Sequence, residues 1–135
     1  MKELHLDLPK EYMVSGEFFS KEDGFRAMNQ LLELEDQPTA IFCASDMLAI
    51  GAIQAINQAG KSVPKDFSII GFDGIDLGQM ISPRLTTIKQ DTTKMGKIAA
   101  KQILTLISDK NKPRIAETIT VDTYLINGET TRVLR

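Results

Sequence analysis

The sequence contains one cysteine and one histidine, and its apolar runs are too short to cross a bilayer. The single cysteine, Cys43, cannot form a disulfide within the chain, which suits a reducing compartment. The N-terminal residues lack the apolar core of a signal peptide, so we expect a cytoplasmic protein without membrane partners. His5 has no partner with which to form a metal site or a catalytic triad.

Signatures of catalysis and of nucleotide binding are also missing. The sequence has no G-x-G-x-x-G motif, no P-loop and no nucleophile elbow. Its net charge of −2 gives no overall attraction to nucleic acid. We therefore expect no catalytic residues, no metal and no cofactor. The length of 135 residues, with 42% hydrophobic and 25% charged residues, is typical of one globular domain.

Short apolar runs alternate with amphipathic segments along most of the chain. The pattern predicts helices at residues 21–34, 46–59 and 93–108, a short helical segment at 75–81, and strands at 12–14, 39–43, 67–72, 85–89, 119–121 and 124–126. The runs at 39–43 and 67–72 are apolar on both faces, which is typical of parallel strands covered by helices on both sides. We predict an α/β fold with a doubly wound parallel sheet flanked by helices.

The helix starts carry capping signals. Ser20 and Asp23 resemble a capping box, and either Ser45 or Asp46 caps the helix at 46–59. Thr92 or Thr93 is the expected cap of the helix at 93–108. The helix at 46–59 is apolar almost all round, so we expect one side to meet the sheet and the other to meet a partner subunit.

Polar side chains stand at the carboxyl ends of three predicted strands: Ser45, Asp73 and Gln90. Ligands of open α/β sheets bind at this edge, so the sequence predicts a binding crevice there. Asp73 is either a turn residue that bonds its own backbone or a carboxylate for ligand hydroxyls. Gln90 is either an ordinary polar residue after a strand or an amide for hydroxyl groups. One of Ser45 and Asp46 must serve as the cap, and position favours Ser45 as the residue that faces the ligand.

Three further features have simple interpretations. Phe18 and Phe19 precede a helix cap, so either ring forms a hydrophobic staple or stacks on a ligand. Cys43 is expected to be a small core residue. The basic residues at 110–114 are expected to lie in a solvated loop.

Several blocks of the sequence, in order, resemble the effector-binding domain of the LacI/GalR family of transcriptional regulators. These blocks are PTAIFCASD at 38–46, FSIIGFD at 67–73, PRLTTI at 83–88, Met95-Gly96, and GETTR at 128–132. The resemblance extends from about residue 18 to the end of the chain. It implies part of a type I periplasmic-binding-protein fold, in which the effector lies between two α/β subdomains.

The resemblance divides the chain into three parts. Residues 1–90 are the back part of the C-terminal subdomain, 91–110 are a crossover and a helix that packs on the N-terminal subdomain, and 111–135 are terminal strands and a tail. The beginning of the sequence carries no strand–helix unit before residue 11, as expected of an internal piece of a larger protein. The helix-turn-helix headpiece, through which such a regulator binds DNA, is absent from these residues.

The resemblance also assigns residues to roles. Asp73 matches the carboxylate that binds sugar hydroxyls, Gln90 the amide beside the hinge, and Phe19 an aromatic that stacks on the ligand. Ser45 occupies a position often held by Asn. The residues implied at a homodimer seam are Ile50, Met80 and Ile81.

The leading hypothesis is the part of a LacI-type regulator that binds a sugar or sugar-like effector. One alternative is the exported substrate-binding protein of a sugar transporter, and another is a phosphoryl-accepting receiver with Asp73 as acceptor. A receiver would need a cluster of further acids at the end of an earlier strand, and this sequence shows none. The helix at 93–108 should expose an apolar stripe, so we expect residues 91–135 to pack on a neighbouring copy or to fold back irregularly, with little effector binding by this chain alone.

Overall fold

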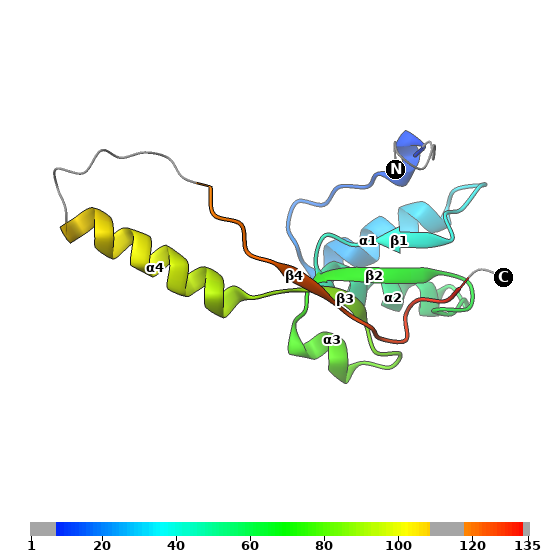
Figure 1. The fold of residues 1–135 in the computed structure, drawn as a ribbon. Helices are drawn as coiled ribbons and strands as arrows, with labels where there is room; N and C mark the ends of the chain where they lie inside the picture. The colour runs from blue at the N-terminus through cyan, green and yellow to red at the C-terminus, as the bar shows by residue number, and fades with distance from the viewer. Residues whose placement is uncertain (1–7, 109–117, 134–135) are drawn as a thin grey trace.

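The structure, a computed structural model, describes residues 8–108 and 118–133. A four-stranded sheet in the order β1-β2-β3-β4 forms its centre (Figure 1). The strands are β1 (Ala40–Phe42), β2 (Ser68–Asp73), β3 (Thr86–Gln90) and β4 (Thr123–Ile126). The first three are parallel, whereas β4 pairs antiparallel with β3. The predicted α/β class is confirmed, with one antiparallel strand at the edge.

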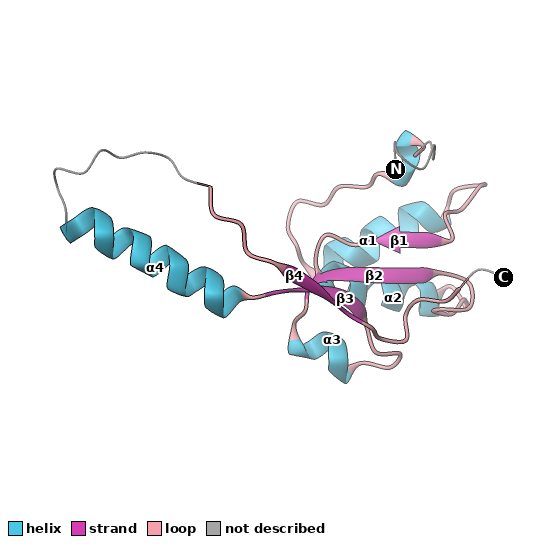
Figure 2. Cartoon of the chain, viewed as in Figure 1, coloured by secondary structure: helices cyan, strands magenta, loops and turns pink. Residues whose placement is uncertain are grey.

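The helices are η2 (Lys10–Tyr12), α1 (Lys21–Leu32), α2 (Asp46–Gln58), α3 (Asp76–Met80) and α4 (Thr92–Ser108). Figure 2 shows α1 and α2 together behind the sheet, and α4 extending away from it. The strands predicted at 12–14 and 119–121 are wrong. Tyr12 ends a 3-10 turn instead, and β3 stops at Gln90, opposite Thr123, so the residues before Thr123 have no strand of the sheet to pair with.

Helices α1 and α2 approach each other so closely that only glycine fits at two positions of the contact. A Cβ atom on Gly24 would lie 2.1 Å from the carbonyl oxygen of Leu48, and one on Gly51 would lie 2.0 Å from that of Lys21. One side of α2 therefore packs on α1, and the predicted contact of this helix with a partner subunit stays a prediction. The buried core under these helices includes Met28, Ala49, Ile53, Ile56, Ile69 and Leu85.

The opposite face of the sheet is only partly covered. Ile69 points into the core and is fully buried, whereas its neighbour Ile70 is half-buried. Phe42 is 60% exposed and meets Phe72 edge to face, with ring centroids 6.5 Å apart. The expectation of helices on both faces is therefore not met within residues 8–108 and 118–133. Apolar side chains point to both faces of these strands, but α1 and α2 cover one of them.

The caps agree with the sequence at two helices and differ at the third. The capping box of Ser20 and Asp23 is present, and the hydroxyl of Ser45 accepts a hydrogen bond from the amide of Leu48 at 3.2 Å. The cap of α4 is neither Thr92 nor Thr93. The carboxyl group of Asp91 accepts from the amide of Lys94 at 2.8 Å, because Asp91 is the last residue before the helix.

The segments after β3 behave in two ways. Helix α4 has no buried residue, and its stripe of Met95, Ala99, Ile103, Leu106 and Ile107 is exposed as predicted. Strand β4 pairs with β3, and the irregular segment after it also lies on the sheet, where Thr130 is fully buried. The expected irregular packing is therefore replaced by strand pairing at Thr123–Ile126. The basic loop at 110–114, like His5, lies outside the described residues.

Candidate ligand-binding edge of the sheet

Asp73 and Gln90 meet at the carboxyl edge of two neighbouring parallel strands. Asp73 is the last residue of β2 and Gln90 the last residue of β3. The side-chain amide of Gln90 donates a hydrogen bond to Oδ1 of Asp73 at 2.7 Å. Both residues are half-exposed, so a ligand can reach them. The structure thus brings together two of the four predicted ligand-binding residues.

The backbone at Asp73 is unusual for a residue with a side chain. Its φ is 110°, and Gly74 follows with a φ of 71°. Such a conformation costs on the order of 1–3 kcal/mol in a non-glycine residue, so the surrounding structure must hold it. Gly74 fits because a Cβ atom there would lie 2.6 Å from Cβ of Lys89. Strained residues of this kind gather at ligand sites.

Ser45 and Asp46 make different hydrogen bonds at the start of α2. Ser45 is 5% exposed and provides the cap, so its oxygen is already in use, while its hydroxyl hydrogen is available for donation. Its predicted contact with a ligand stays a prediction. Asp46 is fully buried and accepts hydrogen bonds from the backbone of Ile75 and the hydroxyl of Thr87. Asp46 is therefore structural through these two bonds, whereas the cap that position favoured for it is provided by Ser45.

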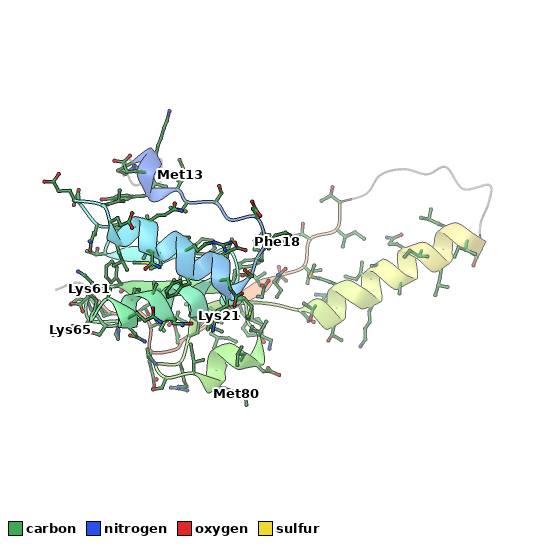
Figure 3. The ribbon with its side chains drawn as sticks, turned by 180° about the vertical axis from the view of Figure 1, so that it is seen from behind. Met13, Phe18, Lys21, Lys61, Lys65 and Met80 are labelled. Atoms are coloured by element: carbon green, nitrogen blue, oxygen red, sulfur yellow. The ribbon has the colours of Figure 1, made fainter. Side chains whose placement is uncertain are left out.

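The two phenylalanines before α1 are both exposed. Phe18 is 70% and Phe19 68% exposed, so neither forms the predicted staple. The backbone amide of Phe18 donates to Oδ2 of Asp23 at 3.0 Å, which holds this segment against the helix start with its rings outward. Figure 3 shows Phe18 near Lys21, at the end of the sheet from which the chain leads to α4. An exposed ring at this edge is free to stack on a ligand.

A hollow of about 280 Å³ adjoins Gln90 where the chain passes between the sheet and α4. Its lining includes Gln90, Asp91, Met95, Asp122 and Thr123. Asp122 and Thr123 are not among the predicted site residues. The antiparallel register of β4 places Thr123 opposite Gln90. The sequence does show a polar pair, Asp122-Thr123, before a short strand. Its position beside Gln90 could not be predicted, because the strand with which it pairs is distant in sequence.

In residues 8–108 and 118–133, no group of three or more His, Cys, Asp or Glu residues could hold a metal ion. Cys43 is 8% exposed, and burial raises the pKa of its thiol to about 12. Within the same ranges, none of the helices combines the length and the apolar character needed to cross a membrane.

The residues predicted at a dimer seam lie on and beside α2 and α3. Ile50 and Ile81 line one shallow groove together with Ile53, Gln54 and Ser82. Met80, at the end of α3, is 81% exposed and stands at the outside of the molecule (Figure 3). The structure therefore places two of the three seam residues on one surface, with the third next to Ile81 in the chain.

Comparison with known proteins identifies the family. The family of periplasmic binding protein-like domains matches residues 1–131. The chain belongs to this family. An HTH-type transcriptional repressor, PurR of Mannheimia succiniciproducens, is 40% identical over 126 residues, which are 93% of this chain and 37% of that protein. A second relative, described as a probable HTH-type transcriptional repressor, ExuR of Bacillus subtilis, is 46% identical over 105 residues, which are 78% of this chain and 31% of that protein.

Solved structures agree with these relatives. A protein described as transcriptional regulator LacI from Bacillus cereus subsp. cytotoxis superposes with a TM-score of 0.91 at 31% identity, over 97% of this chain and 45% of that chain. A LacI family transcriptional regulator from Enterococcus faecium with bound ribose superposes with a TM-score of 0.76 at 34% identity, over 87% of this chain and 42% of that chain.

The predicted resemblance to the effector-binding domain of LacI/GalR regulators is confirmed by these matches. The relatives named here are described as transcriptional regulators and not as enzymes. The chain spans about a third of the length of the curated relatives it matches.

Proposed function

We propose that this chain forms part of the effector-binding domain of a LacI-type transcriptional regulator. Its effector is a sugar or a sugar-like metabolite, and it acts by binding and not by catalysis. The observation that carries the proposal is the hydrogen-bonded pair of Asp73 and Gln90 at the carboxyl edge of the parallel strands. Repressors among the relatives support a regulator more than they support an exported transport protein.

The chemistry of the pair suits hydroxyl groups. The carboxyl group of Asp73 accepts hydrogen bonds, and the amide of Gln90 both donates and accepts them. A sugar offers neighbouring hydroxyl groups that use all of these positions at once. The exposed ring of Phe19 supplies an apolar face for stacking, and the hydroxyl of Ser45 supplies one more donor. The bound ribose in a neighbour of similar fold supports this ligand class.

An effector bound at this edge of the sheet is well placed to affect the segment that leads to α4. Gln90 is separated by one residue from α4, which has no buried residue in the described structure. We infer that residues 1–90 belong to one subdomain, that 91–110 cross to a second subdomain, and that 111–135 return. An effector held between the two subdomains would change their relative orientation, and with it the DNA affinity of a helix-turn-helix domain.

The proposed regulator works as a homodimer in the cytoplasm. Ile50, Met80 and Ile81 are the residues assigned to the seam between its subunits. The groove that contains Ile50 and Ile81 supports this assignment because it joins an apolar part of α2 to the loop after α3. DNA is contacted only by the helix-turn-helix domain.

Calorimetry on the full-length protein that contains this chain tests the proposal. We expect D-ribose or another monosaccharide or disaccharide to bind, and binding to change the affinity for operator DNA. Asp73→Ala should remove both effects, whereas Asp76→Ala, an exposed acid three residues further on, should remove neither. A protein that binds sugars normally after Asp73→Ala would exclude the site described here.

A further inference from the structure

The turn that carries Asp73 is held by a buried side chain from another element. Asp46 is the first residue of α2 and is fully buried. Its Oδ2 accepts a hydrogen bond from the backbone amide of Ile75 at 2.7 Å, and its Oδ1 accepts one from the hydroxyl of Thr87 at 2.5 Å. One carboxyl group therefore connects helix α2, strand β3 and the turn after β2.

The space for this carboxyl group exists because β2 carries a glycine beneath it. A Cβ atom on Gly71 would lie 2.3 Å from Oδ1 of Asp46. The amide that Oδ2 accepts from belongs to Ile75, two residues after Asp73. Asp73 has a φ that L-residues rarely adopt, so its backbone relaxes towards a common conformation unless its neighbours prevent this. The hydrogen bond to Ile75 is placed to prevent it.

We propose that Asp46 is a positioning residue for the ligand site, which keeps the backbone of Asp73 in its unusual conformation and its carboxyl group beside Gln90. The proposal rests on the function proposed above for the contact between Asp73 and a sugar. The control of the turn does not depend on that contact. A purely structural role, in which Asp46 stabilises α2 and β3 through Thr87, uses a different oxygen atom. Variants can therefore separate the two roles.

Three substitutions distinguish the two oxygens. Asp46→Ala removes both acceptors and leaves the amide of Ile75 without a partner. Asp46→Asn restores the network, because its carbonyl oxygen accepts from Ile75 and its amino group donates to Thr87, whose hydroxyl accepts as well as donates. Thr87→Val is the matched control, since it removes a buried hydrogen bond to Asp46 and leaves the bond to Ile75 intact.

The first measurement is made by NMR on the 135-residue chain without ligand. We expect Asp46→Ala to change the amide-to-Hα coupling of Asp73 and to speed amide exchange at Ile75 by about tenfold or more, relative to the core amide of Ile69. Asp46→Asn and Thr87→Val should match the parent in both. An unchanged coupling in Asp46→Ala, or the same change in Thr87→Val, would overturn the proposal.

A second variant changes the donor of the hydrogen bond between Ile75 and Asp46, so that the test does not depend on whether Asp46→Ala folds. Ile75→Pro removes the same hydrogen bond while leaving Asp46 and Thr87 in place, and the φ of −72° at Ile75 suits proline. It should change the coupling of Asp73 while the core amide of Ile69 stays protected. A coupling that stays at the parent value would overturn the proposal as well.

The second measurement uses D-ribose and the full-length protein. Asp46→Ala should weaken ribose binding by about tenfold or more, while Asp46→Asn and Thr87→Val should stay within about threefold of the parent. Parent-like affinity in an Asp46→Ala variant whose turn has changed would overturn the positioning role. If the parent binds no ribose and no other sugar, the proposed function fails, while the coupling of Asp73 still decides whether Asp46 sets the turn.

Discussion

Thr130 and Ile69 are joined by two reciprocal hydrogen bonds although 61 positions separate them in the chain. The amide of Ile69 donates to the carbonyl oxygen of Thr130 at 2.8 Å, and the hydroxyl of Thr130 donates to the carbonyl oxygen of Ile69 at 2.7 Å. The same hydroxyl accepts from the amide of Thr86 at 2.9 Å. One buried side chain thus attaches the C-terminal segment to both β2 and β3.

Thr130→Val should destabilise the protein because the amide of Thr86 and the carbonyl of Ile69 lose a partner in a buried place. We expect a loss of about 1–3 kcal/mol in the free energy of unfolding, measured by denaturant titration. The control is Thr120→Val, a substitution of the same shape at an exposed position. Equal stability of the two variants would show that the buried hydroxyl is not needed to hold the tail.

Asp73→Ala should weaken effector binding without unfolding the protein. Each hydrogen bond to a charged group that is lost costs roughly 1.5–3 kcal/mol, and this variant loses those between the carboxyl group and the ligand hydroxyls. The affinity is measured by calorimetry on the full-length protein, with Asp76→Ala as the control. Unchanged affinity in Asp73→Ala would remove this residue from the site.

Ile50→Asp should weaken the proposed dimer, because a charge without a partner in an apolar seam costs several kcal/mol. Light scattering across a concentration series measures the change in mass. Gln30→Asp adds the same charge at an exposed position of α1 and should have no effect. A mutant with the same association as its parent would place the seam elsewhere.

Cys43 should be unreactive in the folded protein. Burial raises the pKa of its thiol to about 12, so at about pH 8 almost none is present as the reactive thiolate. We expect no reaction with a disulfide reagent under native conditions and stoichiometric reaction in guanidinium. The reactive fraction should rise as pH approaches the raised pKa. Rapid labelling of the native protein at neutral pH would contradict this burial.

The exposed stripe on α4 should promote self-association of the 135-residue chain. Ile103 is 57% and Ile107 64% exposed, and apolar surface of this kind associates in water. The double substitution Ile103→Lys and Ile107→Lys should lower the mass found by sedimentation. Thr105→Lys places one such charge on the other side of the helix and serves as the control. A parent chain that sediments as a monodisperse monomer would contradict the prediction.

Some of this site could be predicted from sequence because its determinants are local. Asp73 and Gln90 each follow an apolar run, and parallel strands bring their carboxyl ends to one edge. The cap at Ser20 depends on residues within three positions of it. The sequence does not decide whether Ser45 or Asp46 is the cap of α2, because both residue types can cap a helix and the choice depends on their surroundings in the fold.

Other features depend on contacts between distant segments and were not predictable in the same way. The run at 12–14 has strand-like residues, but it has no strand beside it in the described sheet. The packing of α2 on α1 depends on Gly24 and Gly51, whose spacing in sequence does not reveal that each lies against the other helix. The hydrogen bonds of Asp46 join residues 29 and 41 positions away.

Gln90 and Thr123 pair at the edge of the sheet, so the chain leaves the sheet towards α4 and returns to it at neighbouring positions. The two connecting segments therefore share nearly the same hinge point. Helix α4 has 17 residues and is therefore about 25 Å long, and a rotation of about 10° at this pivot moves its far end by about 4 Å. Gln90, at the pivot itself, moves far less. In the regulator proposed above, a small adjustment around this side-chain amide would thus be amplified into a displacement comparable to the width of a side chain.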